Sequence, residues 1–140
     1  MLLALALLSC VTDLPAGWED AQPVDDLSQS ACKGSPYDTG FTEAMTASAG
    51  SPGLRVVGEP LAFRCEQDVE AFYKVNGEAV DVLVQPVNMN PKVVAGCDCT
   101  YKVDMGIGVD PPAEVTLYRR WDAINDPNEP VEVGSASVTP

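Results

Sequence analysis

The chain has 140 residues, of which 21 are acidic, 8 are basic and none is histidine, so its formal net charge is -13. This charge opposes binding to phosphate backbones, which argues against nucleic acid as a partner. The missing histidine excludes Ser-His-Asp and Cys-His nucleophile pairs and helical zinc-protease sites. Twelve prolines, eleven glycines and few helical patterns favour an all-β fold in a single domain.

The first ten residues, MLLALALLSC, are mostly apolar and carry no charged side chain. The stretch is too short to span a bilayer, which takes about 20 apolar residues, but it matches the apolar core of a secretory signal. Its end, Leu7-Leu8-Ser9-Cys10, resembles the lipobox of bacterial lipoproteins. The resemblance implies that residues 1–9 are a signal peptide and that Cys10 is acylated. We expect this signal to be truncated, because no Lys or Arg precedes its apolar core. A plain secretory signal and a buried first strand are the alternatives.

Residues 10–31 are predicted to be an acidic, flexible tether. They contain five acidic residues, two prolines and one glycine, and they show no sustained hydrophobic period. A flexible chain of about 20 residues spans roughly 25 Å on average, enough to hold a domain away from a membrane. The folded domain is therefore expected at residues 32–140.

The next predicted elements are short strands at residues 54–57 and 61–65, followed by a hairpin. Residues 69–75 and 78–84 flank Asn76-Gly77, a pair that favours a two-residue type I′ turn. A turn centred on these two residues sets Val75 opposite Glu78 and Tyr73 opposite Val80. The odd residues of the first strand and the even residues of the second then form one apolar face.

Residues 97–109 show the strictest alternation in the chain. The odd positions are Cys, Cys, Tyr, Val, Met, Ile and Val, and the even positions are polar or glycine, which predicts a half-buried strand. Further strands are expected at residues 115–121 and 131–133. Short strands separated by Pro, Gly and Asn turns predict a β-sandwich, which by analogy we expect to be immunoglobulin-like.

Five cysteines remain to be explained. If Cys10 carries lipid, four are left for two disulfides, which persist in an oxidising compartment. Cys97 and Cys99 lie two apart on one strand, roughly 7 Å from each other, so they are not expected to pair together. Cys32 then pairs with one of them and Cys65 with the other, and the sequence does not choose. A thiolate metal site that includes Met105 is the weaker interpretation, because the Cys-x-x-Cys spacing is absent.

Two stretches near the C-terminus hold candidate ligand residues. Tyr118, Arg120 and Trp121 combine aromatic faces with a planar cation, which suits a sugar or a carboxylate. The alternative without a ligand is that Arg120 points outward and pairs with a nearby carboxylate of the protein. The loop that follows offers Asp122, Asp126 and Glu129 as weak calcium candidates, although their spacing is not that of an EF-hand. No cofactor is predicted.

The prediction for function is a lipid-anchored lipoprotein of the bacterial outer membrane, on its periplasmic or its surface side. It would act as a binding or structural module with an unknown protein or glycan partner, and not as an enzyme. One alternative is an extracellular module that binds sugar or calcium. Another is a β-sandwich hydrolase that uses two carboxylates, but the sequence singles out no acidic pair.

Overall fold

A computed structural model describes residues 13–89, 97–112, 114–122 and 128–138 of the chain. The signal and lipidation predictions at residues 1–10 lie outside these ranges. The described residues form nine strands and no helix, so they include no helical segment able to cross a membrane. The strands are β1 (Gln22–Pro23), β2 (Asp26–Gln29), β3 (Met45–Ala49), β4 (Leu54–Arg64), β5 (Val69–Asn76), β6 (Ala79–Pro86), β7 (Asp98–Ile107), β8 (Glu114–Arg119) and β9 (Val131–Ser137).

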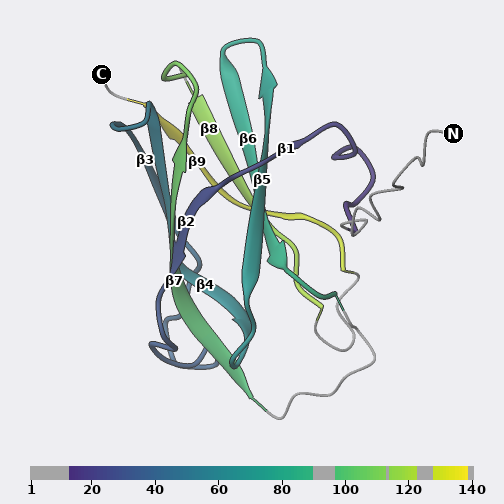
Figure 1. Ribbon diagram of the computed structural model, residues 1–140. Coiled ribbons are helices and arrows are strands. Elements are labelled where there is room, and N and C mark those ends of the chain that lie inside the picture. Colours follow the sequence, from purple (N-terminus) through teal and green to yellow (C-terminus); the bar gives the residue numbers. More distant parts are fainter. Residues whose placement is uncertain (1–12, 90–96, 113, 123–127, 139–140) are drawn as a thin grey trace, which may run out of the picture.

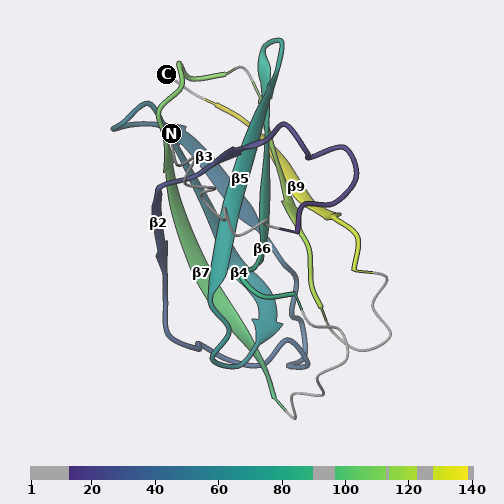
Figure 2. The same cartoon turned by 45° about the vertical axis from the view of Figure 1, so that its right-hand side comes forward.

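The strands form two sheets that pack face to face, which confirms the predicted β-sandwich (Figures 1 and 2). One sheet has the order β1-β5-β6-β8-β9 and the other the order β2-β7-β4-β3. All neighbours are antiparallel except β6 and β8, which run parallel because the chain crosses to the other sheet as β7 between them. The immunoglobulin-like arrangement stays an analogy.

The core lies between the two sheets and follows the predicted alternation. On β7 the odd residues are buried, including Val103 and Met105, which are fully covered. The facing wall comes from three strands of the other sheet: Val69 and Ala71 of β5, Val80, Val82 and Val84 of β6, and Val115 and Leu117 of β8. Apolar side chains from both sheets therefore fill the space between them, which is the arrangement that stabilises a sandwich.

In the β5–β6 hairpin the turn lies one residue further along the chain than predicted, so each β5 residue pairs with a β6 residue two positions later than predicted. Asn76 lies opposite Ala79 and Val75 opposite Val80, so Gly77 and Glu78 occupy the turn. Gly77 has a φ of +60°, which suits glycine at the first central position of a two-residue turn. A shift of two residues equals the side-chain period of a strand, so each residue keeps its predicted face.

The predicted tether is wrong for much of residues 10–31. Residues 22–23 pair with β5 and residues 26–29 pair with β7, so both sheets gain an edge strand from this segment. Trp18 is only 5% exposed. The folded domain thus begins before residue 32, because a segment rich in acids and prolines still supplies backbone groups that sheet edges can bind.

Two further elements differ from the sequence prediction. The strands expected at 54–57 and 61–65 form a single strand, β4, with a bulge between Gly58 and Leu61 that accommodates Pro60. The β3 strand was not predicted, because its sequence MTASA has little apolar character. It pairs with the first half of β4 and forms an edge of its sheet.

Candidate functional site

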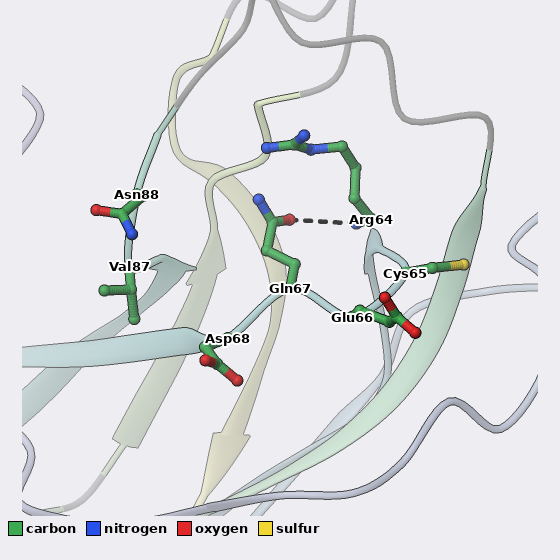
Figure 3. A pocket seen from close by; sticks show the side chains of 7 residues that line it. All are labelled: Arg64, Cys65, Glu66, Gln67, Asp68, Val87 and Asn88. Carbon is green, nitrogen blue, oxygen red and sulfur yellow. Dashed lines mark hydrogen bonds between the residues drawn. The ribbon is translucent and has the colours of Figure 1, made fainter.

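The candidate binding region is a ridge of four residues, 65–68, that joins β4 to β5 at one end of the sandwich. A hollow of about 290 Å³ lies on one side of the ridge, between it and Val87 and Asn88 (Figure 3). A second hollow of about 330 Å³ lies on the other side and is lined by residues 29–32 and Tyr101. Their volumes lie near the lower limit of small-ligand pockets, so each suits a small polar group.

A buried ion pair supports the ridge from within. The Arg64 guanidinium donates through Nε and Nη2 to the two oxygens of Asp122, at 3.0 and 2.6 Å. The Asp122 side chain is fully buried, and Gln67 Nε2 lies 3.2 Å from its Oδ1. A two-point contact of this kind fixes the orientation of both side chains. It joins the end of β4 to the segment that follows β8.

Gln29 of β2 holds the ridge from its other side. Its Nε2 donates to the backbone carbonyl of Gln67 at 2.8 Å, and its Oε1 accepts from the backbone N–H of Val69 at 3.1 Å. The ridge backbone is therefore held by contacts from both sheets, and its conformation is set before any ligand arrives.

The ridge presents two carboxylates, Glu66 and Asp68, and both are exposed. Figure 3 shows them pointing away from the Arg64 guanidinium and the Gln67 side chain. Exposed carboxylates at these positions can accept hydrogen bonds from a ligand or pair with a basic group on it.

The structure separates the three predicted ligand residues. Tyr118 and Arg120 lie on the outer face of their sheet, whereas Trp121 packs against the core beside Arg119. Arg120 donates to the backbone carbonyls of Asn128 and Asp13, at 2.6 and 2.8 Å. Arg120 Nη2 also lies 3.7 Å from the Asp13 carboxylate, so an acidic group is near this arginine, as in the alternative interpretation without a ligand.

Trp18 of the N-terminal segment covers the outer face beside Tyr118. Its ring contacts the Tyr118 ring edge to face, with centroids 5.6 Å apart, and Lys74 Nζ lies 4.3 Å from its centroid. Beneath it, Phe72, Leu83 and Tyr118 are neighbours across three strands. The aromatic surface that the sequence offers to a ligand is therefore covered by this chain's own tryptophan.

The calcium candidates are placed unfavourably for a shared ion. Both Asp122 oxygens face a guanidinium, and a neighbouring cation opposes binding of a second cation. Glu129 is exposed, and Asp126 lies outside the described residues.

A polar network beside the N-terminal segment contains a carboxyl group with a raised pKa. Gln85 is fully buried and donates to Glu70 Oε1 at 3.0 Å and to the Asp13 carbonyl at 3.1 Å. Burial raises the pKa of Glu70 above its usual 4.5, and the hydrogen bond from Gln85 offsets part of this rise. No sequence pattern points to this site, because Gln85 occupies an outward position of β6.

The four cysteines lie together at the same end of the sandwich as the ridge. Cys32 is bonded to Cys99 and Cys65 to Cys97, with Cα–Cα distances of 5.5 and 5.4 Å. The structure thus selects one of the two pairings that the sequence left open. The sulfurs of Cys32, Cys65 and Cys99 lie within 4.8 Å of one another, but all are engaged in disulfides and not free as metal-binding thiolates.

Another hollow, of about 580 Å³, lies at the opposite end of the sandwich. Val75, Val80 and the prolines at 111 and 112 line it, together with Glu78 and Asp110. The two ends of the molecule therefore differ in character, with a polar ridge at one and a mixed apolar hollow at the other.

Comparisons of this chain with protein-family models, with curated proteins and with solved structures found no match.

Proposed function

We propose that this chain is an exported, lipid-anchored binding module of the bacterial cell envelope. The observation that carries the proposal is the pair of disulfides, which tie Cys32 and the start of β7 to the core of the sandwich. Disulfides persist in the periplasm and at cell surfaces and are rare in the reducing cytosol. With Cys10 acylated, every other cysteine of the chain is accounted for.

The binding face in this proposal is the ridge of residues 65–68 with its two hollows. Ion pairing and hydrogen bonds from both sheets hold it, and it presents Glu66 and Asp68 to solvent. On a protein of net charge -13, such a face attracts a partner with basic or hydrogen-bond donor groups. A protein or a glycan can supply such groups.

A lipid at Cys10 would hold the sandwich close to the membrane. The Asp13 carbonyl accepts hydrogen bonds from Gln85 and Arg120, so the chain is already bound to the sandwich three residues after Cys10. Three residues span at most about 10 Å when extended. The stand-off of roughly 25 Å expected from a flexible tether is therefore replaced by a short link.

Expression of the full chain in a Gram-negative host tests the proposal. We expect native protein to appear in the membrane fraction, with an intact mass equal to residues 10–140 plus acyl groups and minus four hydrogens for two disulfides. The Cys10→Ala variant should lose the acyl mass and leave that fraction. Cytosolic protein that retains Met1 and carries free thiols would refute it.

A further inference from the structure

The two disulfides are in direct contact with each other. The sulfurs of Cys65 and Cys99, which belong to different bonds, lie 2.8 Å apart. A disulfide bond is about 2.05 Å long, so a shift of less than 1 Å would bring these two sulfurs to bonding distance. Cys65 lies in the turn that directly follows β4, and its side chain points toward the start of β7 (Figure 3).

Burial differs in a regular way among the four sulfurs. Cys99 is 4% exposed and Cys65 is half-buried, whereas Cys32 and Cys97 are exposed. We call the two more buried residues, Cys65 and Cys99, the inner cysteines. The two exposed residues, Cys32 and Cys97, are the outer cysteines, and each bond joins one inner to one outer cysteine. The two inner cysteines are the pair whose sulfurs touch.

We propose that the four cysteines form a thiol–disulfide exchange site that accepts electrons from a dithiol. Reduction at either outer cysteine gives one common product, with an inner Cys65–Cys99 bond and free thiols at Cys32 and Cys97. The proposal rests on the described sulfurs alone and does not require the lipid anchor.

The first route begins at Cys32. A thiolate of the dithiol attacks the Cys32 sulfur, the Cys32–Cys99 bond breaks, and Cys99 leaves as a thiolate. That thiolate attacks the Cys65 sulfur, so the Cys65–Cys99 bond forms and Cys97 leaves with the electron pair and takes a proton from water. The second thiol of the dithiol then releases Cys32 and closes the dithiol into its own disulfide. Two electrons and two protons have passed from the dithiol to the chain.

The second route begins at Cys97 and ends at the same product. Attack there releases Cys65 as a thiolate, which attacks the Cys99 sulfur and expels Cys32. In both routes the exchange moves negative charge from an inner sulfur to an exposed one. Burial disfavours a thiolate, so moving the negative charge to an exposed sulfur lowers the free energy. The Cys65–Cys99 bond is therefore the one that we expect to remain.

Limited reduction of the purified, oxidised full chain tests the proposal. The protein receives less than one equivalent of dithiothreitol, exchange is quenched with acid, free thiols are alkylated, and peptides are mapped by mass spectrometry. We expect most molecules with one remaining disulfide to carry the Cys65–Cys99 bond and alkyl groups on Cys32 and Cys97. A remaining Cys65–Cys97 or Cys32–Cys99 bond in the majority overturns the proposal, as does direct passage to fully reduced protein.

Two single variants repeat the test without a reductant. Cys32→Ser leaves a Cys99 thiol beside the other bond, and we expect Cys97 to become the free thiol in most molecules. Cys97→Ser leaves a Cys65 thiol, and we expect Cys32 to become free. Far-UV circular dichroism confirms that each variant is folded.

Urea provides the control for random exchange. The same variants unfolded in urea give the mixture of isomers expected without the fold. If the native mixture equals that mixture, or if the free thiol stays on Cys99 in one variant and on Cys65 in the other, the proposal is wrong.

Discussion

At the scale of single residues, Asp122 is a buried charge next to the candidate site. Its carboxylate is fully buried and accepts both hydrogen bonds of the Arg64 guanidinium. Removing one partner of a buried ion pair leaves the other charge unpaired, which costs more than the pair itself contributes. This pair joins the end of β4 to the segment that follows β8 beneath the ridge, so its loss weakens the candidate site and the fold together.

Asp122→Asn is expected to lower the free energy of unfolding by about 3 kcal/mol, because the Arg64 charge stays buried without a counter-charge. Urea denaturation followed by tryptophan fluorescence measures the change. Glu59→Gln is the matched control, since it removes the exposed ion pair with Lys33 and should cost less than about 1 kcal/mol. Equal losses in the two variants would contradict the assignment of Asp122 as a structural charge.

Glu70 gives the molecule a specific pH dependence. Its pKa is raised in the folded state, so the folded protein holds this proton more tightly than the unfolded chain does. The associated stability is fully present below the usual value of 4.5 and is lost as the pH rises through the folded pKa.

Glu70→Gln removes this loss, because an amide does not ionise and its oxygen still accepts from Gln85. We therefore expect the variant to become more stable relative to the wild type as the pH rises from about 4 to about 7. Urea midpoints at several pH values follow the difference. A difference that stays constant with pH would show that ionisation of Glu70 does not affect folding.

At the scale of elements, the N-terminal segment is part of the sandwich. Pro15 and Trp18 are buried, and Val24 donates its N–H to the carbonyl of Ala71 at 2.9 Å. Phe72 and Leu83 lie on the face that the alternation assigns to solvent, yet they are buried. Trp18 contacts Tyr118, the neighbour of Leu83 on this face, so the segment adds apolar cover where apolar side chains interrupt the polar face.

Trp18→Ala is expected to destabilise the fold by about 3 kcal/mol, as is usual when a large buried aromatic is removed. Hydrogen exchange should rise first in residues 15–24, because Trp18 is the main apolar anchor of the segment. Tyr37→Ala is a suitable control, since Tyr37 is 75% exposed and its removal should cost far less. Unchanged exchange in residues 15–24 would mean that the backbone pairing of β1 and β2 holds the segment alone.

At the scale of the whole molecule, the two disulfides join residues that are far apart in the chain. They span 67 and 32 residues and meet at one end of the sandwich, beside the ridge. Loops of this length give about 4 kcal/mol of stabilisation per bond in the chain-entropy description. A domain of this size has a total stability of about 5–15 kcal/mol, so the bonds are a large part of it.

Complete reduction under mild conditions should therefore lower the free energy of unfolding by at least 4 kcal/mol. Thermal and urea unfolding with and without a phosphine reductant give this value. The Cys65→Ser/Cys97→Ser and Cys32→Ser/Cys99→Ser double variants separate the two contributions, which we expect to be similar. Reduced protein as stable as oxidised protein would remove the argument for an oxidising compartment.

A buried ion pair away from the ridge shows the limit of local patterns. Arg119 of β8 is 8% exposed on the inner face beside Val115 and Leu117, and a buried arginine needs an acidic partner. The structure supplies Glu43, whose carboxylate accepts from Arg119 at 2.6 to 3.0 Å. No sequence pattern identified Glu43, because 76 residues separate the two.

The sequence by itself determined the fold class, the faces of the main strands, and the exclusion of a Cys97–Cys99 bond. These properties follow from the two-residue period of an extended chain, which is local. Only the tertiary structure decided the hairpin register, the partner of each cysteine, and the position of Trp18. These depend on which distant segments pack together, and packing is set by the summed contacts of the whole core rather than by any short stretch of residues.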